Sequence, residues 1–309
     1  MYLVTSARVE DTRQALPDID LHLEKGKILL SEGKYNDALT HYQAAVEADK
    51  TNYLTYFKRA TVYLALGRHK NALDDLNEVL SLKPDFLAAR GQRGALLFKQ
   101  GRLDEAHIDL EWVLRSDPYD AEATHLYTLI EPTRRNIENA YMFFEDHEWP
   151  YAIDLLTQLI NDIPYDVKLR EMRSEAYEHA GDLVGAISDL RATTKLKPDN
   201  TDGLLKLSKL HFDLGEPEES LMSIRECLKL DQDHKACFSH YKIVKKIAAQ
   251  VASMNEFSKS KQYSDCSDKA EAALKSNDLS PAIQHLILAS KCHCLNKVCC
   301  ILLCVCVCD

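Results

Sequence analysis

The chain has 309 residues, with 38 Lys and Arg against 48 Asp and Glu, so its formal net charge is −10. This acidic balance argues against a surface for nucleic acid or anionic membranes, because such surfaces need clustered basic residues. A hydrophobic fraction of 46% is ordinary for a globular protein and too high for a disordered one. The longest apolar run, residues 298–308, is only half as long as a membrane span of about 20 residues.

Residues 1–18 form an N-terminal extension that lacks the marks of a secretory signal. The segment has no basic start and no apolar stretch of about 7–15 residues. We therefore expect either a cytoplasmic protein or a protein whose leader is absent from this sequence.

A short motif recurs along the chain with a period of 34 residues. Its occurrences are GKYNDAL (33–39), GRHKNAL (67–73), GRLDEAH (101–107), GDLVGAI (181–187) and GEPEESL (215–221). Prolines keep the same period, at Pro84 and Pro118 and again at Pro164 and Pro198. A fixed period of this length indicates a stacked-repeat architecture.

Each period predicts two helices. In residues 53–86, apolar side chains recur at helical spacing before Gly67 and again after it. Glycine adopts the left-handed conformation that ends a helix, and proline cannot continue one, so Gly67 and Pro84 are expected to end the two helices. The small side chain of Ala72 lets the paired helices approach closely. The predicted fold is all-α.

Six complete units and a weaker seventh follow from this pattern. They are residues 19–52, 53–86, 87–120, 133–166, 167–200, 201–234 and 247–280. In the fourth unit His147 replaces the turn glycine. In the sixth Ser220 replaces the packing alanine, and in the seventh Lys261 and Cys266 replace the glycine and the alanine.

Two inserts of 12 residues, 121–132 and 235–246, separate groups of three repeats. Both have helical patterns, and we expect each to lengthen a helix. The predicted domains are subdomain I (19–132), subdomain II (133–246) and a truncated subdomain III (247–297), followed by a divergent cysteine-rich tail (298–309).

The 34-residue unit resembles the tetratricopeptide (TPR) repeat, a superhelical solenoid of antiparallel helix pairs. The strings LHLEKGKILLSEGKYNDALTHYQAAVEAD, RECLKLDQDHKACFSHYKIVKK and ASKCHCLNK resemble the endoplasmic-reticulum TPR co-chaperones of DnaJ subfamily C, also called the interferon-induced protein kinase inhibitor family. The resemblance covers residues 19–297. It implies a TPR region that holds unfolded clients and a J domain that stimulates a BiP-type chaperone through a His-Pro-Asp motif.

The sequence contains no His-Pro-Asp, so we interpret it as a client-holding fragment that ends before the J domain. The resemblance implies work in the unfolded-protein response in the lumen of the endoplasmic reticulum. Two alternatives remain open at this point: an inhibitor that docks on a stress-activated protein kinase, and a cytoplasmic TPR scaffold. No catalytic motif is recognisable, and acidic pairs such as Asp74-Asp75 are expected on solvated helix faces, so we predict neither an enzyme nor a cofactor.

In TPR arrays the first helix of each pair lines the concave face. We predict client contacts from exposed apolar residues of these helices, which are Leu23, Leu30, Leu54, Phe57, Leu64 and Phe98. Leu54 and Phe57 are the strongest candidates; the alternative is that all six pack between helices. A clamp for acidic chaperone tails would use the positions of Leu23, Lys27, Lys58, Ala88 and Gln92, where most of the required side chains are missing.

All ten cysteines lie from Cys227 onward. Cys227 and Cys237 flank a predicted helical corner, where they can form either a disulfide or two buried thiols. The oxidising compartment of the resembling family favours the disulfide. The tail, CHCLNKVCCILLCVCVCD, lacks the paired C-x2–4-C spacing of structural zinc sites, so we predict no metal there and expect the tail to be disordered.

Overall fold

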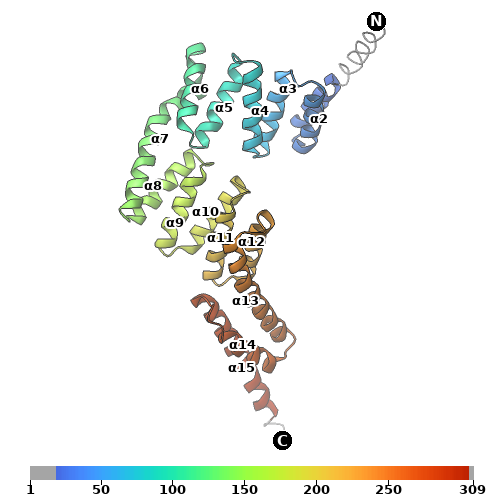
Figure 1. The fold of residues 1–309 in the computed structure, drawn as a ribbon, viewed down its shortest axis with the longest axis vertical. Helices are drawn as coiled ribbons and strands as arrows, with labels where there is room; N and C mark the ends of the chain where they lie inside the picture. The colour runs from blue at the N-terminus through green and yellow to red at the C-terminus, as the bar shows by residue number, and fades with distance from the viewer. Residues whose placement is uncertain (1–18, 306–309) are drawn as a thin grey trace. The chain divides into compact units, whose positions relative to one another are not determined.

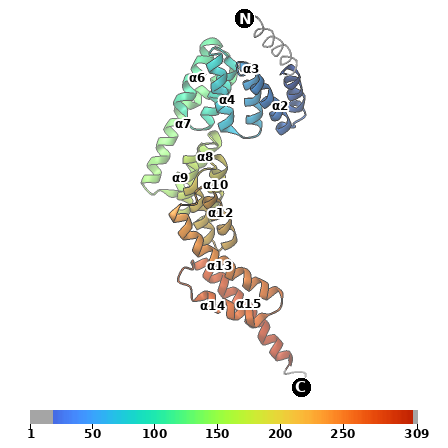
Figure 2. The ribbon, with the colours of Figure 1, turned by 45° about the vertical axis from the view of Figure 1, so that its right-hand side comes forward.

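The computed structural model describes the backbone of residues 19–305 and the side chains of residues 19–298. The predicted N-terminal extension and residues 306–309 of the predicted tail lie outside the described residues. Throughout the described part the regular elements are helices (Figures 1 and 2). A helix over residues 19–31 is followed by α2 (Tyr35–Ala48), α3 (Tyr53–Ala65), α4 (His69–Leu82), α5 (Leu87–Lys99), α6 (Leu103–Ser116), α7 (Ala121–Glu145), α8 (Trp149–Asp162), α9 (Val167–His179), α10 (Leu183–Leu196), α11 (Thr201–Asp213), α12 (Pro217–Leu230), α13 (Lys235–Lys259), α14 (Tyr263–Leu274) and α15 (Pro281–Val305).

The chain falls into two compact units. Unit 1 comprises the residues up to Glu138 together with Asp162–Tyr165, and unit 2 comprises Asn139–Asn161 and the residues from Asp166 onward. The finer division into three subdomains stays a prediction. Among the described residues, no helix combines the length and the apolar character that crossing a membrane requires.

The paired helices of a repeat pack against each other, as α3 does on α4 and α11 on α12 (Figure 1). A small residue at one register position of the second helix is completely buried in every repeat. These residues are Ala38, Ala72, Ala106, Ala152, Ala186, Ser220 and Cys266. A larger side chain at this place would separate the paired helices, which explains the period of small residues in the sequence.

The turn between two paired helices contains one residue whose backbone lies in the left-handed region. The five turn glycines, Gly33, Gly67, Gly101, Gly181 and Gly215, have φ between 68° and 87°. His147 and Lys261, which replace glycine in the fourth and seventh repeats, adopt φ of 61°. The turn geometry is therefore kept where the sequence departs from the motif, at the expense of strain that glycine avoids.

Both 12-residue inserts are helical. They form the first halves of α7 and α13, which are each 25 residues long, and this confirms the expectation that the inserts lengthen a helix. The tail differs from the prediction. Residues 298–305 continue α15 instead of forming a disordered segment, because the stretch from Ala282 to Val305 contains neither Gly nor Pro to end the helix.

Candidate functional site

The six predicted client-contact residues differ in accessibility. Leu54 on α3 is exposed, with 44% of its surface accessible, and Leu23, Leu30, Phe57 and Leu64 are half-buried. The expected exposure of Phe98 is wrong, because only 1% of its surface is accessible. The C-terminal end of α5 buries five consecutive residues, Gly94–Phe98, so this part of the helix is covered on all sides and presents no apolar stripe to solvent.

The half-buried residues have packing partners inside unit 1. Leu23 and Leu30 lie against the cluster of Ala38, Tyr42 and Val62. Phe57 and Leu64 lie against the cluster that contains Leu76, and the ring of Phe57 meets Phe86 edge-on with centroids 5.0 Å apart. Packing between helices thus takes part of the surface of each of these residues and leaves the rest accessible.

Two further apolar residues that the sequence analysis did not select are exposed in unit 1. Leu21 and Ile28 on the helix 19–31 are exposed, each by about half of its surface. Together with Leu54 they place exposed apolar side chains on the first helices of repeats 1 and 2. We call the group of Leu21, Ile28, Leu54 and Phe57 the apolar surface of unit 1. The signal that could have found Leu21 and Ile28 is their seven-residue spacing, which puts both on one helix face.

The helix that carries Leu54 and Phe57 is firmly held. The side chain of Asn52 caps α3 by accepting a hydrogen bond from Leu54 N at 3.1 Å. Arg59 on α3 donates to the buried carboxylate of Asp75 on α4. The apolar side chains therefore stand on a preorganised helix, which reduces the ordering that binding requires.

Cys227 at the end of α12 and Cys237 at the start of α13 form a disulfide with Cα atoms 6.5 Å apart. A second disulfide joins Cys266 on α14 to Cys294 on α15, with Cα atoms 6.2 Å apart. The sequence analysis did not pair these two, since it assigned Cys266 to helix packing and Cys294 to the tail. Cys292, two residues before Cys294, is exposed and outside both disulfides.

One half-buried histidine of unit 1 has a shifted pKa. The ring of His69, at the start of α4, stacks on Tyr165 with centroids 3.8 Å apart, and its Nδ1 finds no hydrogen-bond partner among the described residues. Burial and the charge of Lys99 lower the pKa of His69 below its ordinary value. The neutral ring acts here as a packing group against Tyr165.

Family models match three parts of the chain. A model described as TPR repeat matches residues 26–67, and one described as Tetratricopeptide repeat matches residues 53–86. A third, described as Anaphase-promoting complex subunit 5, matches residues 167–245. The first two confirm the all-α TPR fold that the 34-residue period predicted.

Longer similarities identify the family. The chain is 44% identical over 286 residues to "DnaJ homolog subfamily C member 3" of Bos taurus, an alignment that covers 91% of this chain and 56% of the relative. It superposes with a TM-score of 0.76 and 43% identity on the "Crystal Structure of P58(IPK) TPR Domain", covering 91% of this chain and 79% of that one. The chain belongs to the family of DnaJ homolog subfamily C member 3.

The chain is also similar to a fungal protein. A "Tetratricopeptide repeat and J domain-containing co-chaperone DNJ1" of Cryptococcus neoformans is 31% identical over 251 residues, which are 81% of this chain and 48% of the relative. The name of this fungal relative describes a co-chaperone. The chain spans about half the length of the curated relatives it matches, and the matched part is the TPR array.

Proposed function

We propose that this TPR array holds unfolded or misfolded polypeptides on the apolar surface of unit 1 and releases them without ATP. The observation that carries the proposal is the exposure of Leu54, Ile28 and Leu21 on the first helices of the first two repeats. Unfolded chains expose apolar side chains that folded proteins bury, so such a surface favours them. Membership of a co-chaperone family supports the same reading.

The expected binding is weak and reversible. Burial of about 300 Å² of apolar client surface at about 25 cal/mol per Å² supplies about 7 kcal/mol before costs. Loss of client freedom and ordering of side chains on both partners offset most of this free energy. Holding of this kind needs neither a catalytic residue nor a cofactor.

We place this activity in the lumen of the endoplasmic reticulum, as part of the response to unfolded proteins. Two disulfides, Cys227–Cys237 and Cys266–Cys294, favour an oxidising compartment, because cytosolic thiols are kept reduced. A BiP-type chaperone would then be the partner that receives the client. This transfer would also require the J domain that the family resemblance implies.

The test is suppression of aggregation. The full chain is added to a chemically denatured model protein while light scattering is followed, and the variant Ile28→Ser/Leu54→Ser is compared with Val184→Ser/Met222→Ser. The control pair is exposed to a similar degree, by 65% and 54%, but lies in unit 2. Circular dichroism verifies that both variants keep their helicity.

We expect the parent and the control variant to suppress scattering and the Ile28→Ser/Leu54→Ser variant to lose most of this effect. No suppression by the parent at several-fold molar excess would contradict client holding. That outcome would fit a chain that docks on one folded kinase and ignores denatured proteins.

A further inference from the structure

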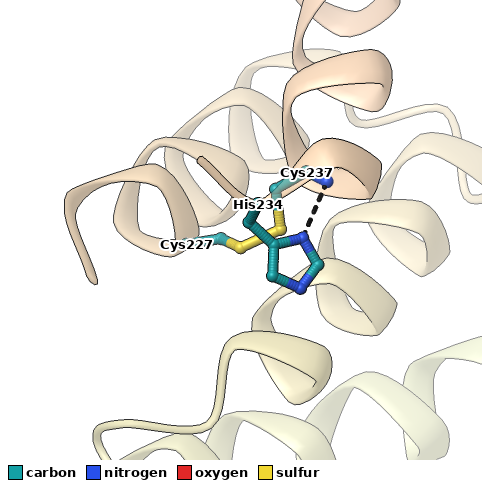
Figure 3. A group of neighbouring side chains, drawn as sticks. All are labelled: Cys227, His234 and Cys237. Atoms are coloured by element: carbon teal, nitrogen blue, oxygen red, sulfur yellow. Dashed lines mark hydrogen bonds between the residues drawn. A yellow bond between two sulfur atoms is a disulfide. The ribbon is translucent and has the colours of Figure 1, made fainter. Parts of the chain in front are cut away.

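Three potential metal ligands converge at the corner between α12 and α13. The sulfur atoms of Cys227 and Cys237 and a ring nitrogen of His234 all lie within 4.8 Å of one another (Figure 3). Both cysteines are fully buried, whereas His234 is partly accessible. The sequence analysis singled out the two cysteines but not the histidine. The spacing C-x6-H-x2-C differs from a paired zinc knuckle.

The chain contains a second corner of the same construction that lacks these ligands. It lies 114 residues earlier, between α6 and α7, where Val113 and Ala123 are buried in place of the two cysteines. Asp120 stands in place of His234 and accepts a hydrogen bond from Ala123 N at 2.8 Å. The repeat architecture therefore closes this corner with Val, Asp and Ala, and it requires neither sulfur nor imidazole.

His234 also caps its helix, since its Nδ1 accepts a hydrogen bond from Cys237 N at 3.2 Å. An aspartate or asparagine would cap equally well. The imidazole adds a nitrogen ligand beside two sulfurs, and this combination suits Zn²⁺ and other thiophilic ions.

We propose that reduction of the Cys227–Cys237 disulfide converts this corner into a binding site for a thiophilic divalent ion such as Zn²⁺. Two molecules of a thiol reductant are oxidised to their disulfide and supply two electrons and two protons, which yields two cysteine thiols. Zn²⁺ then binds both sulfurs as thiolates, with release of two protons to solvent, and takes one imidazole nitrogen as its third ligand.

The backbone separation at the corner fits both states. The Cα atoms are 6.5 Å apart, near the long end of the range for disulfides. A tetrahedral Zn²⁺ with Zn–S bonds of about 2.3 Å holds two sulfurs about 3.8 Å apart. Side-chain rotation within the reduced corner can provide that spacing, and the ion and the disulfide exclude each other.

The surroundings offer a further oxygen ligand. His234 Nε2 lies 3.7 Å from Oδ1 of Asp202, whose side chain is 91% exposed. A carboxylate at this place can orient the imidazole or occupy the fourth coordination position. Water can take that position when the carboxylate remains outside.

The test uses the full chain with only the two corner cysteines retained, so that the other thiols do not bind the probe. Cysteines 266 and 294 are replaced by Ala, and cysteines 292, 299, 300, 304, 306 and 308 by Ser. Alanine at 266 is the residue that other repeats carry at this position. The protein is reduced with a phosphine, and Co²⁺ is titrated while thiolate-to-cobalt absorption is recorded.

The matched control is Cys227→Val/His234→Asp/Cys237→Ala, which copies the corner at Val113, Asp120 and Ala123. We expect the reduced parent to bind one equivalent of Co²⁺ that Zn²⁺ displaces, and the control to show no such band. His234→Asn, which keeps a helix cap, should weaken binding at least tenfold. The oxidised parent should not bind.

Equal binding by the parent and the control variant would overturn the proposal, and so would full affinity in His234→Asn. A second measurement guards against misfolding of the cysteine-poor chain. The reduced wild-type chain should hold one more equivalent of Zn²⁺ than wild type carrying only the three corner substitutions. Equal metal content would also overturn the proposal.

Discussion

Arg59 on α3 and Asp75 on α4 form a two-point ion pair within the second repeat. Nε and Nη2 of Arg59 donate to the two carboxylate oxygens at 2.8 and 2.7 Å, and only 4% of Asp75 is exposed. The arginine also reaches Gln43 of the preceding repeat through Nη1, at 3.4 Å. One guanidinium thus joins three helices.

The same arrangement, with Arg and Asp 16 residues apart in the sequence, recurs in two other repeats. The corresponding pairs are Arg93–Asp109, with Asn77 of the preceding repeat, and Arg173–Asp189, with Thr157. These pairs connect consecutive repeats through polar contacts in addition to apolar packing. The expectation that Asp75 lies on a solvated helix face is therefore wrong.

Breaking this pair from one side should be costly. Burial raises the pKa of Asp75 and the hydrogen bonds from Arg59 oppose that effect, so Arg59→Leu leaves a carboxylate that burial disfavours. We expect a loss of about 3–5 kcal/mol in the free energy of unfolding of unit 1, measured by urea denaturation.

The double variant Arg59→Leu/Asp75→Ser should lose much less, because the sixth repeat carries Leu207 and Ser223 at the same positions. This comparison separates the value of the pair from the cost of one unpaired charge. A double variant as unstable as Arg59→Leu would contradict the account.

The positive φ at the turn positions Lys261 and Gly181 predicts opposite changes in stability for two substitutions. Lys261→Gly should raise the free energy of unfolding by about 0.5–1 kcal/mol, because it relieves a strained φ of 61°. Gly181→Ala should lower it by about 1 kcal/mol, and since a Cβ at Gly181 meets no atom within 4 Å, backbone strain alone accounts for the loss.

The control for these turns is Lys58→Gly, the same exchange at an exposed position inside α3. It should destabilise by about 1 kcal/mol, because glycine disfavours a helix interior. Thermal denaturation of the three variants measures the signs. Equal signs for Lys261→Gly and Lys58→Gly would show that the turn is not strained.

The repeat period, the helix pairs, the turn glycines and the lengthened helices could all be predicted from the sequence. They depend on local rules, because glycine and small alanines must recur wherever the same helix pair is built. The exposure of single side chains could not be predicted. Leu30, Leu64 and Phe98 share one register position, yet only Phe98 is fully buried, since neighbouring helices decide accessibility.

The second disulfide was hidden for a related reason. Cys266 replaces a packing alanine, and its partner Cys294 lies in a segment whose composition suggested disorder. Pairing depends on α14 and α15 packing together, which becomes visible only once the tail is known to be helical. Likewise, the ligand role proposed for His234 depends on the corner between α12 and α13, which places its ring beside the sulfurs of Cys227 and Cys237.

Cys266→Ala offers a redox-dependent test of that disulfide. Under non-reducing conditions the variant should lose about 2–4 kcal/mol of stability in unit 2, because the unfolded chain is no longer cross-linked. Under reducing conditions its free energy of unfolding should lie within about 1 kcal/mol of that of the parent, since alanine is the usual residue at this position. A loss that is equal in both conditions would indicate a packing defect.

Unit 1 should lose stability in mild acid through His69. The pKa of His69 lies below its ordinary value of 6.5, so the unfolded state takes up the proton first as the pH falls. The stability associated with the neutral ring is complete above that value and is lost as the pH falls through the lowered pKa. We expect His69→Leu, which copies Leu103 of the third repeat, to flatten the pH dependence between about pH 7.5 and 5.5.

Urea midpoints of the parent and of His69→Leu at both pH values provide the measurement. The parent should show the larger decrease on acidification. An equal decrease in the two proteins would place the acid sensitivity elsewhere, with His240 of unit 2 as the next candidate, because burial and Lys209 lower its pKa in the same direction.

The most direct test of the account is site-specific cross-linking of an unfolded client. One variant carries a photoreactive residue at position 54, and a second variant carries it at position 184. Val184 is more exposed than Leu54 but lies in unit 2. Each is irradiated with a permanently unfolded model protein and, separately, with its folded form. The account predicts strong cross-links from position 54 to the unfolded client and weak ones from position 184 or to the folded form. Equal cross-linking from both positions, or none from position 54, would contradict a client-holding surface in unit 1.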